Sequence, residues 1–141
     1  MKSLSVKLGA ILIGLTLFGY AEVWGADWKL YSTHENFLNY YDAQSITRPS
    51  KNIVRVWERI NYTEKGVTWM MVKHGPGFKD VSFLTILNEI NCIEKKLRIL
   101  SQIIYDNKGE VVHSSSSSSS SEWAVITPES MAEDLYKQVC K

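Results

Sequence analysis

Three segments alternate apolar and polar residues over most of their length, and this pattern limits the fold more than any other feature of the chain. They are NIVRVWERINYT (52–63), SFLTILNEINC (82–92) and KKLRILSQIIYD (95–106). A repeat of two residues is that of a β-strand with one buried face. IEKK predicts a hairpin turn between the last two segments, and NKGE predicts a tighter turn after them. We therefore predict an antiparallel sheet.

The alternation also assigns side chains to faces. The apolar face of the first segment contains Val54, Val56, Ile60 and Tyr62, that of the second Leu84, Ile86, Ile90 and Cys92, and that of the third Leu97, Ile99, Ile103 and Tyr105. Glu58 interrupts the first of these faces. We interpret Glu58 as one half of an ion pair on the strand surface. A general base in a cleft is the alternative.

Shorter patterns complete the expected elements. DWKLYST (27–33), GEVV (109–112) and EWAVI (122–126) predict further strands, and NFLNYYDAQSI (36–46) predicts a strand that ends in a turn at Asp42–Ser45. RPSKN (48–52) predicts a further turn. EKG (64–66) predicts the end of a strand at a glycine that can take a positive φ. A short helix is expected to start at Trp69–Met71 and must end at Gly75–Gly77.

Eight consecutive serines, Ser114–Ser121, leave a tail of 20 residues. A tail of this length cannot bury enough apolar surface to fold alone, so it must complete the core of one domain, residues 26–141. We interpret the serine run as a flexible loop inside that domain, with a glycosylated or adhesive loop as the alternative. The tail itself predicts a C-terminal helix, with Thr127 as its cap and Pro128 in its first turn.

The chain has two cysteines, Cys92 and Cys140. In an exported protein such a pair indicates a disulfide, because the compartments outside the cytoplasm are oxidising. The bond would fasten the tail to the strand 82–92 and stabilise the fold by about 4 kcal/mol in the chain-entropy model. A reactive thiol or a metal-binding pair is the alternative.

The first 25 residues predict a secretory signal peptide. Lys2 and Lys7 precede the uncharged apolar run Leu8–Tyr20, which is too short to span a bilayer comfortably. Cleavage is expected between Gly25 and Ala26, with Ala21 as the second choice and an uncleaved anchor as the alternative. Cleavage changes the formal charge from +1 to zero, because two lysines and one glutamate are lost. A neutral domain gives no electrostatic reason to expect nucleic acid as a partner, or stable membrane insertion.

Several stretches together resemble the bacterial surface-adhesin protein E family. They are DWKLY, YYDAQSITRPSKNIVRVW, EINC, RIL, YDNKGEVV, SEW and MAEDLYKQVCK. The resemblance covers the chain from Asp27 to Lys141. It implies an α+β fold, with an antiparallel sheet of about six strands and a C-terminal helix packed on one face. It also implies that the domain is often dimeric and that namesake members attach to host matrix and serum proteins at the cell surface.

No catalytic or metal-binding arrangement is recognisable. His34, His74 and His113 lack a metal-binding spacing, and we interpret each as a solvated or structural histidine. The serine run specifies no Ser-His-Asp geometry, and no phosphate-binding loop is present. We predict a non-enzyme without a cofactor or metal.

Arg55, Trp57 and Arg59 are the strongest candidates for partner binding. The alternation places them on one strand face, opposite the apolar face. Aromatic and arginine side chains dominate binding hot spots. We expect an exported adhesin-like domain that binds another protein, either a host matrix protein or an envelope protein, and that can form a homodimer. A periplasmic inhibitor or stress protein acting on an envelope enzyme is the alternative.

Overall fold

The computed structural model describes residues 25–117 and 122–141. The predicted signal peptide up to residue 24 therefore lies outside the described residues. The elements are β1 (Trp28–Thr33), β2 (Phe37–Asp42), η1 (Ala43–Ser45), β3 (Thr47–Ser50), β4 (Ile53–Tyr62), α2 (Glu64–His74), η2 (Pro76–Phe78), β5 (Val81–Asn91), β6 (Lys96–Asp106), β7 (Val111–Ser116), β8 (Ala124–Val125) and α3 (Met131–Val139).

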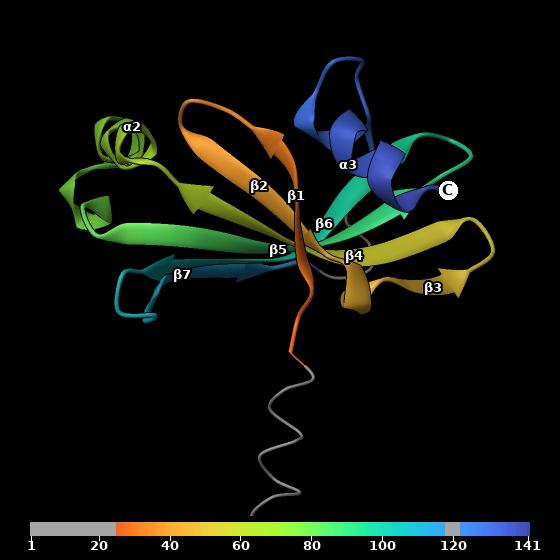
Figure 1. The fold of residues 1–141 in the computed structure, drawn as a ribbon, viewed down its shortest axis with the longest axis horizontal. Helices are drawn as coiled ribbons and strands as arrows, with labels where there is room; N and C mark the ends of the chain where they lie inside the picture. Colours follow the sequence, from red (N-terminus) through yellow and green to blue (C-terminus); the bar gives the residue numbers. More distant parts are fainter. Residues whose placement is uncertain (1–24, 118–121) are drawn as a thin grey trace, which may run out of the picture.

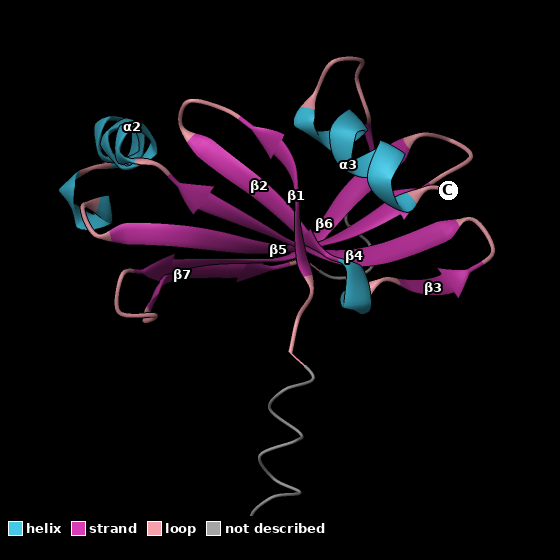
Figure 2. Cartoon of the chain, viewed as in Figure 1, coloured by secondary structure: helices cyan, strands magenta, loops and turns pink. Residues whose placement is uncertain are grey.

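All the strands belong to one antiparallel sheet. Its path runs β1-β2-β4-β5-β6-β7, while the short strands β3 and β8 pair with β4 and β6. The predicted sheet of about six strands with a C-terminal helix is confirmed; β8 lies within the predicted strand 122–126, and β3 is an additional short strand. Figure 1 shows the strands fanning out of a strongly twisted sheet. The helices α2 and α3 lie on the same side of it, near opposite ends (Figure 2).

The side of the sheet that carries both helices, the inner face, holds two separate apolar clusters. One cluster joins α3 to the sheet through Val54, Val56, Ile90, Ile126, Leu135 and Val139. The other joins α2 to the sheet through Ile60, Met70, Val81, Leu84, Ile86 and Ile104. Glu58 lies on β4 between these two clusters, and it is buried. The opposite side of the sheet is the outer face.

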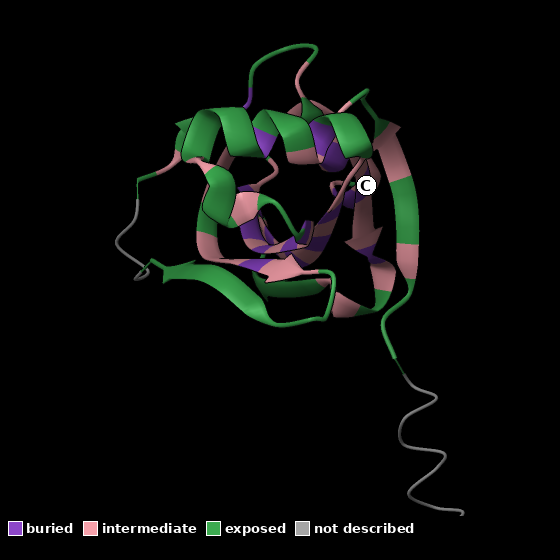
Figure 3. Ribbon diagram, turned by 90° about the vertical axis from the view of Figure 1, so that its left-hand side faces the viewer, coloured by how far each residue is buried: buried purple, intermediate pink, exposed green. Residues whose placement is uncertain are grey.

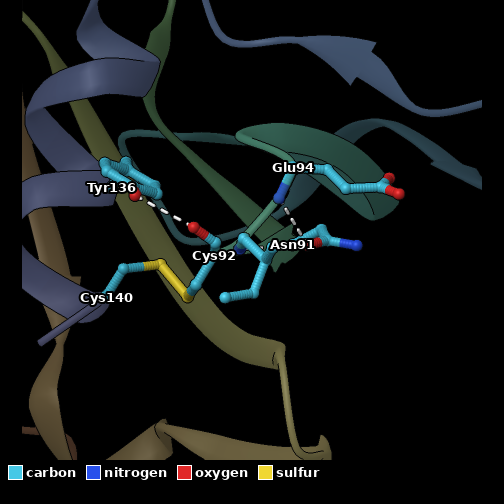
Figure 4. The surroundings of a disulfide bond; sticks show 6 residues. Asn91, Cys92, Glu94, Tyr136 and Cys140 are labelled. Atoms are coloured by element: carbon cyan, nitrogen blue, oxygen red, sulfur yellow. Dashed lines mark hydrogen bonds between the residues drawn. A yellow bond between two sulfur atoms is a disulfide. The ribbon is translucent and has the colours of Figure 1, made fainter.

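The predicted disulfide between Cys92 and Cys140 is present. Cys92 follows β5 and Cys140 is the C-cap of α3, so the bond fastens the last helix to the sheet (Figure 4). The hydroxyl of Tyr136 adds a hydrogen bond to the carbonyl oxygen of Cys92, at 3.0 Å. The C-terminal helix is therefore held to the end of β5 by a covalent bond and a hydrogen bond, and its buried residues Leu135 and Val139 pack on the sheet.

The predicted start of that helix was wrong. Ser130, not Thr127, is the N-cap, because its Oγ accepts a hydrogen bond from the N–H of Glu133 at 3.1 Å. The same Oγ donates to the carbonyl oxygen of Thr127 at 2.7 Å. Glu129 has a φ of 61°, a left-handed conformation that a helix cannot contain. The chain therefore turns at Pro128 and Glu129 before α3 begins.

Helix α2 begins five residues earlier than predicted. Thr63 caps it by accepting a hydrogen bond from the N–H of Gly66 at 3.1 Å. Gly66 does not end a strand with a positive φ, as the sequence suggested, but lies buried inside the helix. A Cβ atom at this position would collide with the carbonyl oxygen of Asn36. The glycine is therefore required for close packing of α2 on the β1–β2 turn.

Strand β6 carries a bulge that the alternation did not reveal. Leu87 pairs with Ser101 and Asn88 pairs with Ile99, which leaves Leu100 as an extra residue. The bulge reverses the faces of the residues that follow, so that Ile104 is buried while Tyr105 stacks on Phe83. The prediction that Ile103 and Tyr105 share the apolar face with Leu97 was therefore wrong.

One predicted turn and one predicted loop are partly strand. Thr47–Ser50 forms β3 on the edge of β4, so only Lys51 and Asn52 of RPSKN form the turn. The first three serines of the run, Ser114–Ser116, pair with β6 as the second half of β7, whereas a loop was expected from Ser114 onward. Residues 118–121 of the run lie outside the described residues.

Candidate binding surface

The structure places Arg55, Trp57 and Arg59 together on the outer face of β4. They occupy alternate positions, and the residues between them are buried on the inner face. All three are half-buried, and the side chain of Arg55 is 41% exposed. Strand β4 lies between β2 and β5 in the sheet. The stripe therefore lies in the interior of the sheet rather than on an edge strand.

Arg55 belongs to a cluster of two arginines around one buried carboxylate. Its Nη2 and Nε atoms lie 2.8 and 3.3 Å from Oε2 of Glu89 on β5. Arg98 on β6 contacts the other oxygen, with Nη2 at 2.8 Å and Nε at 2.9 Å. The guanidinium of Arg98 also lies 4.4 Å from the ring centroid of Trp123. One carboxylate therefore orients two guanidinium groups.

Electrostatics keep this carboxylate ionised. Burial alone would raise the pKa of Glu89, but hydrogen bonds and the positive charges of Arg55 and Arg98 outweigh it, and the pKa falls below its ordinary value. Charge-assisted bonds to a buried carboxylate restrict the arginine side chains. Arg55 is therefore preorganised on the surface.

Arg59 stands in a different, aromatic environment. Its guanidinium lies 3.9 Å from the ring centroid of Phe83, and its Nε donates to Oδ1 of Asn61 at 2.8 Å. Phe83 stacks on Tyr105 with 4.7 Å between ring centroids. Trp57, between the two arginines, lies opposite Leu87 of β5. We call the whole surface the outer-face patch: Arg55, Trp57, Arg59, Phe83, Leu87, Arg98 and Tyr105.

The sequence located only the β4 part of this patch. Its other members come from β5 and β6, and the register of three strands brings them beside β4. The position of Phe83 could have been found, because it alternates with the apolar residues of its strand. The position of Tyr105 was hidden by the bulge in β6.

The prediction that Glu58 is half of an ion pair on the strand surface was wrong. Glu58 is instead buried, with Oε2 accepting from the Tyr31 hydroxyl and Oε1 from Nδ2 of Asn88 at 3.3 Å. Burial raises the pKa of Glu58 above its ordinary value, although both hydrogen bonds act in the opposite direction. Burial and the neighbouring Glu58 raise the pKa of Tyr31, so its hydroxyl remains protonated. The cluster is a polar layer between the two apolar clusters.

All three histidines are exposed, as expected of solvated side chains, but two of them line the same cavity. His34 stacks on Phe37 with a 5.8 Å centroid distance. His74 of α2 and His113 of β7, far apart in sequence, both line one cavity of about 510 Å³ on the inner face. Among residues 25–117 and 122–141, no three His, Cys, Asp or Glu side chains are grouped so that they could hold a metal ion.

Comparison with known proteins identifies the family. None of the helices in the described part of the chain is long and apolar enough to cross a membrane. Neither a curated protein nor a solved structure matches the chain. The family model for surface-adhesin protein E, however, matches residues 28–141. This match covers the whole sheet, both helices and the outer-face patch, and the chain therefore belongs to the surface-adhesin protein E family.

Proposed function

We propose that this chain is an exported, non-enzymatic module that binds another protein through its outer-face patch. The observation that carries the proposal is a sheet face rich in arginine and aromatic side chains that no helix covers within the described residues. Both helices pack on the inner face, so these side chains stay half-exposed. Surfaces of this composition, with an apolar centre and guanidinium groups around it, are typical of protein interfaces.

The charge of the patch indicates the chemistry of the partner. Three arginines and the one carboxylate of Glu89 give the region a formal charge of 3 − 1 = +2. Arginine binds carboxylates through two parallel hydrogen bonds. We expect a partner surface with acidic side chains around an apolar group that packs against Trp57.

The compartment decides between adhesion and the alternative, an inhibitor or stress protein that acts on an envelope enzyme. Membership of a surface-adhesin family supports an exported protein that acts at the cell surface. We expect intact cells to bind an antibody raised against the domain. Exclusive release of the protein by osmotic shock, without antibody binding to intact cells, would favour the periplasmic alternative.

Site-specific photocrosslinking tests the patch directly. A photoreactive phenylalanine analogue at Trp57 is expected to capture a partner protein, in the cell envelope or on immobilised matrix proteins. The matched control carries the analogue at Ile93, which is 73% exposed in the β5–β6 turn, away from the patch. Equal capture from both positions would contradict the proposal. A crosslink at Trp57 between two copies of this chain would mean that the patch is a dimer interface instead.

A further inference from the structure

The cavity on the inner face has a largely apolar lining. Ile60, Leu84 and Ile104 of the sheet line it, and Trp69 of α2 and Met131 of α3 line it from the two helices. Its volume of about 510 Å³ lies within the range of small-molecule pockets, roughly 300–1,000 Å³. Figure 3 looks onto the side of the molecule where α2 and β7 lie. The cavity and the outer-face patch lie on opposite faces of the sheet.

The aromatic residues around this cavity support each other. Phe37 contacts the rings of Tyr62 and Trp69 at centroid distances of 5.7 and 5.6 Å, with the rings nearly edge to face. His74 continues the series between Trp69, at 6.5 Å, and Phe78, at 5.5 Å. Rings packed in this way restrain one another, so the walls are preformed and little ordering is needed when a ligand enters.

Polar groups are few and lie toward the rim. His74 and His113 are exposed and offer imidazole N–H donors, while Gln102 is half-buried. Lys73 adds a positive charge next to the rim, with Nζ at 4.5 Å from the ring centroid of Trp69. The described residues that line the cavity include no aspartate or glutamate. A ligand with an apolar body and an anionic end matches this arrangement.

A peptide matches it less well. The floor of the cavity is formed mainly by strands β4, β5 and β6, whose backbone groups are paired with one another in the sheet, while β2 and β7 contribute one lining residue each, Phe37 and His113. A peptide lying on the apolar side chains would bury its own N–H and C=O groups without partners, which is unfavourable. An acyl chain has no such groups.

We propose that the cavity binds one molecule of a medium-chain fatty acid. The acyl chain lies against Ile60, Leu84 and Ile104, with Trp69 beside it. The carboxylate lies at the rim, where His74 and His113 donate hydrogen bonds to it. This site is independent of the partner protein and of the outer-face patch.

Calorimetric titration of the purified protein with octanoate, decanoate and dodecanoate, each kept monomeric, tests the proposal. We expect one bound molecule and an affinity that rises about four-fold per methylene, the equivalent of roughly 0.8 kcal/mol. Affinity that does not change with chain length, or several molecules bound per protein, would overturn the proposal. So would binding to anionic phospholipid vesicles without binding to monomeric decanoate.

Two variant pairs locate the binding. Trp69→Ala is expected to weaken decanoate binding about ten-fold, as loss of part of an apolar wall should. Val72→Ala on the same helix, at a residue that is 84% exposed and does not line the cavity, should change it less than about two-fold. Equal weakening by both changes would place the ligand elsewhere.

The second pair tests the anionic end and uses exposed residues of β7, so that folding is preserved. His113→Glu adds a carboxylate at the rim and should weaken decanoate binding about ten-fold. The same variant should bind decyltrimethylammonium, which has the same chain length and a cationic head group, no more weakly than the wild type does. Val112→Glu has the same charge on the same strand but does not line the cavity, and should leave decanoate binding nearly unchanged. If His113→Glu had no effect, the proposed position of the carboxylate would be wrong.

Discussion

Each end of the inner face is covered by a helix, but the two ends differ in how tightly the helix packs on the sheet. At the α3 end, Val54, Val56, Ile90, Leu135 and Val139 are buried almost completely, and a disulfide holds the helix in place. At the α2 end, the apolar side chains leave a cavity, and Trp69, Met71 and Val72 of the helix remain exposed. One end supplies stability, and the other leaves space for a ligand. A small domain can have a tightly packed end and an open end on one sheet when a polar layer, here the Glu58 cluster, separates the two apolar clusters.

The largest effect is expected from the covalent bond at the α3 end. Replacing both Cys92 and Cys140 by alanine should lower the free energy of unfolding by about 4 kcal/mol, because the unfolded chain gains the freedom of a long open loop. Urea unfolding of the oxidised protein and of the variant measures this difference. If the two curves coincided, the α3 end would not depend on the bond, and the comparison of the two ends would lose its main support.

Truncation of one core side chain at each end compares their packing. Leu135→Ala should cost about 3–4 kcal/mol, because Leu135 is 1% exposed in a sealed cluster and its removal creates a new cavity. Met70→Ala should cost about 2 kcal/mol, since Met70 already borders an existing cavity. Both values follow from denaturant unfolding. A greater cost at Met70 would show that the α2 end is the more tightly packed one.

The sequence predicted the better-sealed end more successfully. The alternation in β4 and β5 located Val54, Val56 and Ile90, and the tail predicted the helix that carries Leu135 and Val139. The exposed positions of the alternation also located Arg55, Trp57 and Arg59, because a strand without bulges assigns faces reliably.

The α2 end could not be read in the same way. The apolar residues of α2 are spread around the helix, so they do not recur with the helical period that would mark one buried face. The bulge at Leu100 exchanges the two faces of β6 for the residues after it, so Ile103 and Tyr105 were assigned to the wrong face. The cavity itself depends on residues that are far apart in sequence, such as His74 and His113, which only the folded sheet brings together.

A glycine tests how α2 is seated. Gly66→Ala should destabilise the protein by about 1–2 kcal/mol, although alanine is the better helix former, because its Cβ meets the backbone of Asn36. Gly77→Ala is the matched control, since nothing lies within 4 Å of its added Cβ. Thermal unfolding of both variants measures the difference. If Gly66→Ala were as stable as the control, α2 would be free to shift on the sheet, and its cavity would not be preformed.

The smallest effect is expected at the boundary between the two ends, where Glu58 is buried. Its pKa in the folded protein is raised above the ordinary value of 4.5, mainly by burial. A carboxyl of this kind contributes stability that is fully present below its unfolded pKa and is lost as the pH rises through its folded pKa.

The variant Glu58→Gln tests this dependence, because glutamine keeps the shape of the side chain but does not titrate. The unfolding free energy of the wild type should therefore fall relative to that of this variant as the pH rises above the ordinary pKa of 4.5. Glu89, whose pKa is lowered, has the opposite dependence at more acidic pH, but it is present in both proteins and cancels in the difference. Unfolding measured from pH 4 to pH 8 provides the test. A difference that stayed constant over this range would mean that Glu58 is as well solvated in the fold as in the unfolded chain. The polar layer would then be open to water, and the cavity at the α2 end would extend into the sealed α3 end.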